Sequence, residues 1–136
     1  MEPLETLRAR IAEFPGYDTI LERRRSDEYV RSYLGEALTE MAAGRTFPAE
    51  SQRRIEALVL RVAFADPKSF PVHAGAQARS NPSDMHAVTE ADAATVELAD
   101  QAAKVDAASA ARYLDEIAAA LDERDAALRA AALKTP

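Results

Sequence analysis

The chain has 136 residues, 48% of them hydrophobic, with no cysteine and a formal net charge of −6 at pH 7. This length is typical of one domain whose core is large enough to fold without disulfide bonds. The lack of cysteine excludes disulfides, thiolate zinc sites and cysteine nucleophiles. The acidic charge argues against nucleic acid as a partner, because an acidic surface repels phosphate backbones.

No stretch of the sequence predicts a membrane segment. A spanning helix needs roughly 20 consecutive apolar residues, whereas the longest mostly apolar run, ALVLRVAFA at 57–65, is interrupted by Arg61. The opening MEPLETLRARIAEF is charged throughout and lacks the apolar run of a secretory signal. We therefore expect a cytoplasmic protein without membrane contact. The preference for arginine and alanine is typical of a GC-rich bacterial genome, which is an association rather than a physical argument.

The N-terminal half shows helical periodicity from its first residues. Apolar side chains at three- and four-residue spacing predict a helix over 3–14, which a Pro-Gly pair ends. A short helix over 18–25 and a stronger one over 27–43 follow, with Ser26 as the expected N-cap of the second. A further helix over 48–65 is the most apolar of the chain, so we expect it to be central.

Residues 66–87 form a long loop that contains both histidines and three prolines. Fully extended, this segment reaches roughly 70 Å. It is predicted to be a crossover that runs the length of the bundle, so that helices 48–65 and 89–105 lie parallel. Loops of this length are also often functional. A ligand-binding or catalytic site under the 66–87 loop is therefore an alternative.

Two alanine-rich helices, over 89–105 and 108–132, are predicted after the loop. Their apolar positions are out of phase near 105–109, which favours a break there over a single helix from 89 to 132. Alanine buries little apolar area, so these faces are predicted to pack against a partner chain. The residues expected to contact that partner include Leu98, Val105, Leu121 and Leu128.

The histidines are the weak candidates for a metal site. Zinc needs three or four ligands, so His73 and His86 would have to converge with Asp66 or Asp84. The sequence has neither the H-E-x-x-H pattern nor the E-x-x-H pattern of helical metal sites. Two solvated loop histidines are the favoured interpretation, and no metal or other cofactor is expected.

The most basic stretch is Arg23, Arg24 and Arg25. Clustered guanidinium groups can hold a phosphate, an acidic peptide or a nucleic-acid backbone, and Tyr29 lies close enough in sequence to join such a site. The competing interpretation, which we favour, is that these arginines pair with neighbouring acidic residues.

Together the patterns predict an all-α fold. We expect a helical bundle of about four principal helices with one or two short N-terminal helices, forming a single domain over 1–136. Catalytic motifs of the serine-hydrolase and phosphate-loop types are absent from the sequence. The expected function is non-enzymatic, through protein–protein contacts that include self-association.

Overall fold

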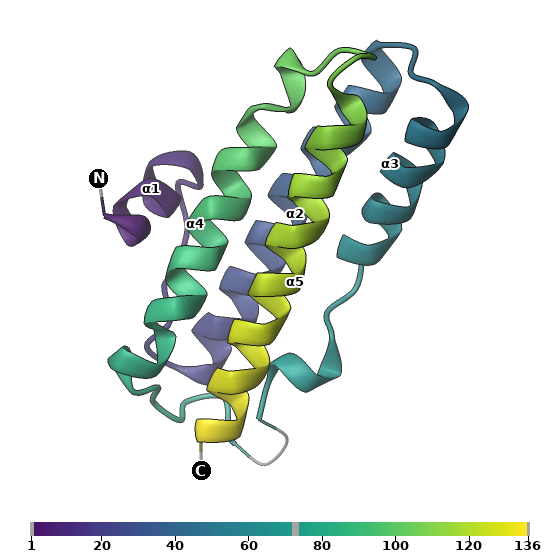
Figure 1. Ribbon diagram of the computed structural model, residues 1–136. Helices are drawn as coiled ribbons and strands as arrows, with labels where there is room; N and C mark the ends of the chain where they lie inside the picture. Colours follow the sequence, from purple (N-terminus) through teal and green to yellow (C-terminus); the bar gives the residue numbers. More distant parts are fainter. Residues whose placement is uncertain (1, 72–73, 136) are drawn as a thin grey trace.

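The computed structural model describes residues 2–71 and 74–135, which fold into a bundle of α-helices (Figure 1). Four long helices form the bundle, and one short helix lies against its outside. In chain order they are α1 (Pro3–Arg10), α2 (Ile20–Gly44), α3 (Ala49–Val62), α4 (His86–Asp100) and α5 (Ala110–Lys134). The predicted all-α bundle is therefore confirmed. Within the described residues, every helix falls short of the combined length and apolar character that a bilayer crossing needs.

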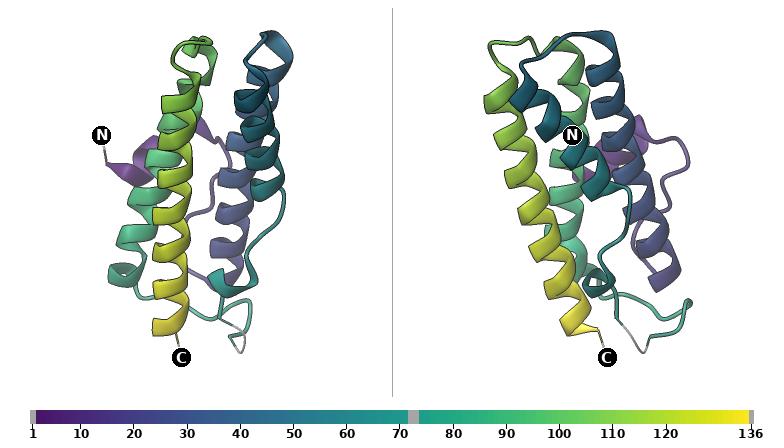
Figure 2. Two further views of the ribbon diagram at one scale, coloured as in Figure 1. Left: turned by 45° about the vertical axis from the view of Figure 1, so that its right-hand side comes forward. Right: turned by 90° about the vertical axis from the view of Figure 1, so that its right-hand side faces the viewer.

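The bundle consists of two antiparallel hairpins, α2–α3 and α4–α5, that lie side by side (Figure 2). α2 packs against α3 and α4, and α5 packs against α4 and α3, so α3 and α4 occupy opposite corners. Ion pairs join Arg54 to Asp115 and Arg61 to Asp122, and each pair is 61 residues apart in sequence. This constant offset shows that α3 and α5 run parallel.

The connection from α3 to α4 crosses one end of the bundle. It contains two 3-10 turns, η1 (Pro67–Ser69) and η2 (Pro82–Met85), and Phe70 and Met85 anchor it in the interior. Its backbone also reaches the start of α2, where the N–H groups of Ile20 and Leu21 donate to carbonyls of the loop at 2.9 Å. The loop therefore closes the bundle end and satisfies backbone donors that a helix start leaves free.

The prediction that this loop runs along the bundle is wrong. α3 already runs toward the end of the bundle at which α4 begins, so the chain after it follows only the last part of the bundle and then crosses that end (Figure 1). The helices predicted over 48–65 and 89–105 are consequently antiparallel and not parallel. Loop length sets how far the chain can reach, but it does not determine the direction of the next helix.

One continuous helix, α2, replaces the two helices predicted over 18–25 and 27–43. Thr19 is its N-cap: the hydroxyl accepts the backbone N–H of Glu22 at 3.1 Å, and the Glu22 carboxylate reaches back to that hydroxyl. Threonine at the N-cap and glutamate three residues later is the residue pattern of a capping box, but here the carboxylate is hydrogen-bonded to the Thr19 hydroxyl. Ser26, the predicted N-cap, lies inside the helix and donates to the Gly16 carbonyl at 2.6 Å. Glycine and proline are absent from this part of α2, so no residue there stops the helix.

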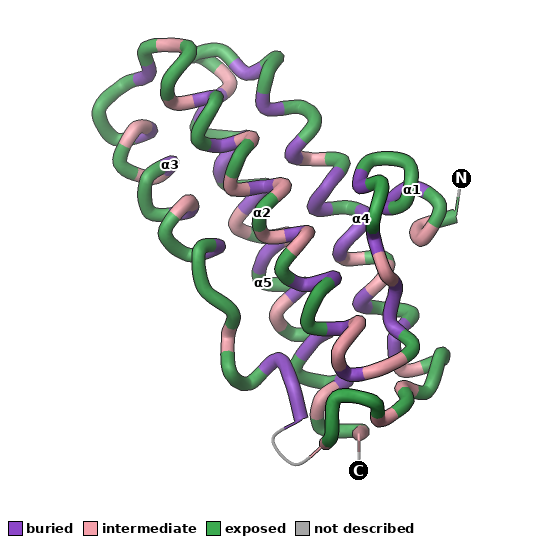
Figure 3. The backbone as a smooth tube through the Cα atoms, turned by 180° about the vertical axis from the view of Figure 1, so that it is seen from behind, coloured by how far each residue is buried: buried purple, intermediate pink, exposed green. Residues whose placement is uncertain are grey.

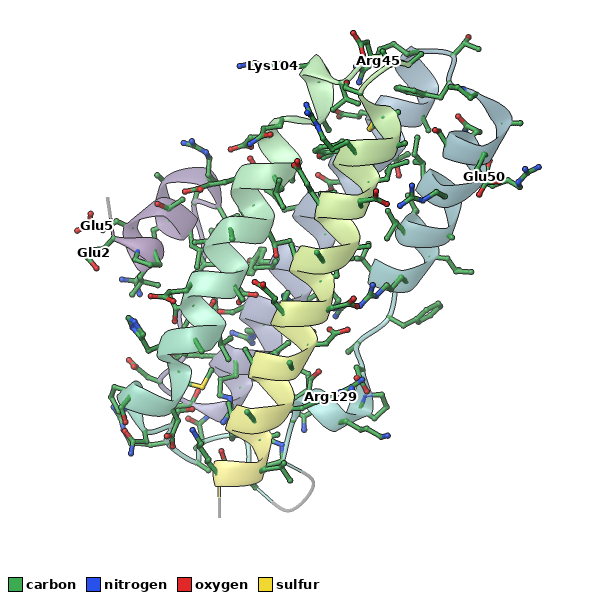
Figure 4. The ribbon with its side chains drawn as sticks, viewed as in Figure 1. Glu2, Glu5, Arg45, Glu50, Lys104 and Arg129 are labelled. Atoms are coloured by element: carbon green, nitrogen blue, oxygen red, sulfur yellow. The ribbon has the colours of Figure 1, made fainter. Side chains whose placement is uncertain are left out.

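The predicted break near 105–109 is present, and a single helix from 89 to 132 is therefore wrong. α4 is followed by the 3-10 turn η3 (Ala102–Lys104). Asp106 and Ser109 then close a turn, with the backbone N–H of Ser109 on the Asp106 carboxylate at 2.9 Å. Arg45, after α2, donates to the Ala102 carbonyl at 2.7 Å and ties this turn to the neighbouring hairpin (Figure 4).

Two apolar clusters fill the interior, and buried positions alternate with exposed ones along each helix (Figure 3). One cluster joins α2, α3, α4 and α5 toward the end that holds η3. The other joins α1 and the segment after it to the lower parts of α2, α4 and α5. Short alanine side chains let α4 and α5 approach closely, and larger residues from the other elements cover the remaining apolar surface.

Candidate functional site: a buried charge network and the α2–α3 groove

A buried arginine links three helices between the two apolar clusters. Arg124 of α5 is 2% exposed. Its Nε donates to Asp92 Oδ1 on α4 at 2.6 Å, and its Nη2 donates to Asp27 Oδ1 on α2 at 2.5 Å. The hydroxyl of Tyr17, before α2, donates to the other Asp92 oxygen at 2.5 Å. A single guanidinium therefore holds α2, α4 and α5 at one level of the bundle.

Burial and charge act in opposite directions on this network. Burial alone would lower the pKa of the Arg124 guanidinium, but the carboxylates of Asp92 and Asp27 outweigh it and raise the pKa. Burial raises the pKa of the Asp92 carboxyl, against the opposing effects of Arg124 and Tyr17. Burial, together with Asp92, also raises the pKa of Tyr17 well above its usual range. Arg124 and Tyr17 therefore keep their protons at neutral pH and act as donors to Asp92.

Arg31 extends the network toward the surface. Its Nε donates to Asp27 Oδ2 at 2.9 Å, so the network contains two guanidinium groups and two carboxylates. Its Nη1 donates to the carbonyl of Val62, the last residue of α3, at 3.1 Å. Arg31 therefore connects the buried charge network to the C-terminal end of α3.

A small cavity of about 190 Å³ lies between this network and the start of the 66–87 loop. Its lining includes Arg124, Asp66 and Ser69. The charged groups that border it are engaged: Arg61 pairs with Asp125 at 2.9 Å and Asp66 with Arg129 at 2.6 Å (Figure 4). Since its acids are already paired with arginines, this cavity offers no ready acid or base to a substrate, and the network around it fastens helices together.

A larger groove, of about 660 Å³, runs between α2 and α3. Gly35 and Val62 lie where the two helices approach closely: a Cβ built at Gly35 would be 3.4 Å from Val62 Cγ2. The α2 side of the groove carries three carboxylates, from Glu28, Glu36 and Glu40. Gly35, which has no side chain to keep the two helices apart, therefore lies at the bottom of the groove.

The α3 side of this groove carries exposed apolar residues. Phe64, which lines the groove just beyond the end of α3, is 73% exposed; Leu60, next to the lining residue Val59 but outside the lining itself, is 67% exposed. Most large apolar side chains of the described residues are buried in the two clusters. Large apolar residues that remain exposed together, rimmed by polar residues, are typical of contact surfaces.

The structure separates the predicted arginine cluster. Arg23 is 1% exposed and points into the bundle, where its Nη1 donates to Thr135 Oγ1 at 3.1 Å. Arg24 lies over the ring of Phe70, 5.1 Å from its centroid, and Arg25 lines a surface hollow beside α1. The alternative of one basic site is therefore wrong, because consecutive residues of a helix project about 100° apart. The described contacts of Arg23 and Arg24 are with hydroxyls and an aromatic ring, and not with the neighbouring acids that the favoured interpretation gave them.

The other predicted contact residues lie largely within the fold. Val105, Leu121 and Leu128 are buried in the two apolar clusters, and Leu98 is half-buried against the first of them. Tyr29 is half-buried and its hydroxyl donates to Glu13 at 3.4 Å. The alanine-rich faces are covered by the helices of the same chain, so they do not offer a free surface to a partner.

Of the two histidines considered as metal ligands, the structure describes one. His73 lies outside the described residues. His86 begins α4, is exposed and pairs with Glu90 at 2.9 Å. Within residues 2–71 and 74–135, no three side chains of the histidine, cysteine, aspartate and glutamate types gather to hold a metal ion.

Sequence reasoning missed the residues of the charge network. Its one visible signal was Arg124, which stands in the apolar spacing of the last helix at a position where the pattern expects a buried side chain. A charged residue at such a position predicts a buried counter-charge. The partners Asp27 and Asp92 could not be identified, because neither carries a local signal.

Comparisons with known protein families, with curated proteins and with solved structures give no match for this chain.

Proposed function

We propose that this protein acts through protein–protein contacts, and that the partner docks in the groove between α2 and α3. The observation that carries the proposal is the exposed side chain of Phe64, which lines the groove together with the apolar residues Val59 and Val62. A few large side chains of this kind supply most of the binding energy in protein interfaces. A groove between two helices fits an amphipathic helix of the partner.

The paired state of the buried charges supports a binding role over an enzymatic one. An acid–base catalyst needs a titratable group that can reach substrate. Asp27 and Asp92 are held by Arg31, Arg124 and Tyr17 away from solvent. The groove, by contrast, is open and adjoins this rigid layer through Arg31. Preorganised surfaces of this kind lower the entropic cost of binding.

Self-association through the alanine-rich faces of α4 and α5 has lost its support, since those faces are buried in the chain itself. Sedimentation velocity tests separately whether the protein forms a dimer through the groove. A dimer that dissociates in the Leu60→Ser/Phe64→Ser variant would make a second copy the occupant of the groove.

A displayed library of helical peptides, selected on the purified protein, tests the proposal. Selected peptides are expected to lose at least about tenfold in affinity for the Leu60→Ser/Phe64→Ser variant. Leu133→Ser is the matched control, because Leu133 is 88% exposed on α5 and away from the groove. Peptides whose binding is indifferent to Leu60 and Phe64 would place any contact surface elsewhere and contradict the proposal.

A further inference from the structure

We infer that the α2–α3 groove is built for a basic amphipathic helix of a partner protein, an inference that rests on the proposed function and specifies its partner. The contacts would divide between two sides of the groove. Apolar side chains of the ligand helix would lie against Val59, Phe64 and the groove bottom. Its lysine or arginine side chains would face the carboxylates of α2.

The charge of the groove supports a basic ligand. Glu28, Glu36 and Glu40 all line it from α2, and all three are exposed. The lining cation is Arg31, which is held by Asp27 and by the Val62 carbonyl. The charge of Arg31 is therefore already compensated by Asp27 and not by the three glutamates. The C-terminal end of α3, where carbonyl groups carry partial negative charge, borders the same groove and adds to its negative potential.

The spacing of the glutamates fits a helix. Glu36 and Glu40 are about one turn apart, and Glu28 lies slightly more than two turns before Glu36, about 80° around α2 from it, yet all three line the groove. From Glu28 to Glu40 the row extends about 18 Å, which is the length of roughly twelve helical residues. A ligand helix of three to four turns aligned with α2 would place basic residues opposite all three carboxylates.

A second copy of this chain is a poor occupant by the same argument. In a symmetric dimer the same surface patch occurs on both sides of the interface. The three glutamates of one groove would then approach the three of the other. Like charges brought together at an interface oppose association. The groove therefore favours a partner of opposite charge.

Two synthetic helical peptides of about 18 residues test this inference. Both carry the same leucine face, and their polar face is lysine in one and glutamate in the other. The lysine peptide is expected to bind, more weakly as salt is raised toward about 0.5 M; the glutamate peptide is expected not to bind. Glu36→Lys/Glu40→Lys should weaken the lysine peptide by about tenfold or more. Phe64→Ser should weaken it comparably.

Matched variants control for the net charge of the protein and for nonspecific hydrophobic binding. Glu116→Lys/Glu123→Lys makes the same change of charge on the exposed side of α5 and should leave affinity within about twofold. Equal binding of both peptides, still dependent on Phe64, would overturn the charge inference and keep the proposed function. The lysine peptide could instead bind equally well to the Phe64→Ser variant and weaken equally in both double-lysine variants. Net charge alone would then explain its binding, and the groove would be ruled out as the site.

Discussion

Two buried arginines of this protein differ in how they are partnered. Arg124, in the middle of the bundle, has carboxylates on two of its nitrogens. Arg23, at the end where the 66–87 loop crosses, is equally buried, yet its Nε and Nη2 have no hydrogen-bond partner among the described residues. Burial lowers the pKa of Arg23, whereas Asp92 and Asp27 overcome the same effect at Arg124.

The difference shows that burial of a charge does not by itself reveal its contribution to stability. A buried ion pair is roughly neutral when compared with apolar residues of the same size, but removing one partner leaves the other charge uncompensated. Arg124 should therefore be needed for the stability of the fold, because it compensates the charge of two buried aspartates. Arg23 should be much less important, because its described hydrogen-bond partners are two neutral hydroxyls, of Ser80 and Thr135, and Asp84 acts on it through charge alone.

The largest expected effect is that of Arg124→Met. Loss of the guanidinium leaves Asp27 and Asp92 buried with less opposite charge, which should lower the free energy of unfolding by about 3–5 kcal/mol. Chemical denaturation followed by circular dichroism measures this. Arg53→Met, at an exposed position on α3, is the control and should change stability by less than about 0.5 kcal/mol. A loss below about 1 kcal/mol for Arg124→Met would show that the network is not a structural requirement.

Tyr17→Phe should have the next largest effect. The variant keeps the ring in the apolar cluster but removes the hydroxyl that donates to Asp92. Leaving one buried carboxylate oxygen without a donor should lower the free energy of unfolding by about 2 kcal/mol. Because both changes act on Asp92, the effects of Tyr17→Phe and Arg124→Met should not add. Additive effects in the double variant would contradict a shared network.

Arg23→Met should have the opposite sign to Arg124→Met. A methionine removes two buried donors that have no hydrogen-bond partner in residues 2–71 and 74–135, so the free energy of unfolding should stay unchanged or rise by about 1 kcal/mol. The same denaturation experiment measures it, in parallel with Arg124→Met. A loss comparable to that of Arg124→Met would mean that Arg23 has a charged partner in the folded protein, and the contrast between the two arginines would not hold.

The smallest expected effect concerns Tyr33, at the surface where α1, α2 and α4 meet. Burial, and then the hydrogen bond to Asp100, raise the pKa of Tyr33 to about 12. The folded protein thus keeps this proton above the pH at which the unfolded chain releases it. The contribution to stability is complete below about pH 10 and falls as the pH rises toward the folded pKa. Tyr33→Phe should reduce the decrease in stability over this alkaline range, measured by denaturation at several pH values; an unchanged decrease would contradict the shift.

Local patterns predicted the helices better than their connections. Apolar spacing located α3, α4 and α5, and the change of phase near 105–109 located the turn between the last two. The division of α2 at Ser26 is wrong, because the sequence contains an earlier helix-start signal, Thr19 followed by Glu22. The earlier signal prevails because no glycine or proline lies between Thr19 and Ser26 to interrupt the helix.

The candidate site was much less predictable. The arginine triplet was conspicuous in the sequence, but its three side chains diverge. The groove depends on which face of α2 lies beside α3, and Leu60 and Phe64 belong to an apolar pattern that predicted burial. α3 has more apolar residues than two neighbouring helices can cover, so part of its apolar surface stays exposed. The exposure of these apolar residues depends on how many helices surround α3, and a local sequence pattern does not contain that information.

The sequence by itself determined the secondary structure and the alternation of apolar and polar faces, because hydrogen bonds and side-chain spacing within a helix are local. The tertiary structure decided which helices are neighbours, which charges are buried together and which apolar residues remain exposed. Asp27, Asp92 and Arg124 illustrate the reason. They lie far apart in the chain, and each becomes a partner of the others only when three helices pack at one level.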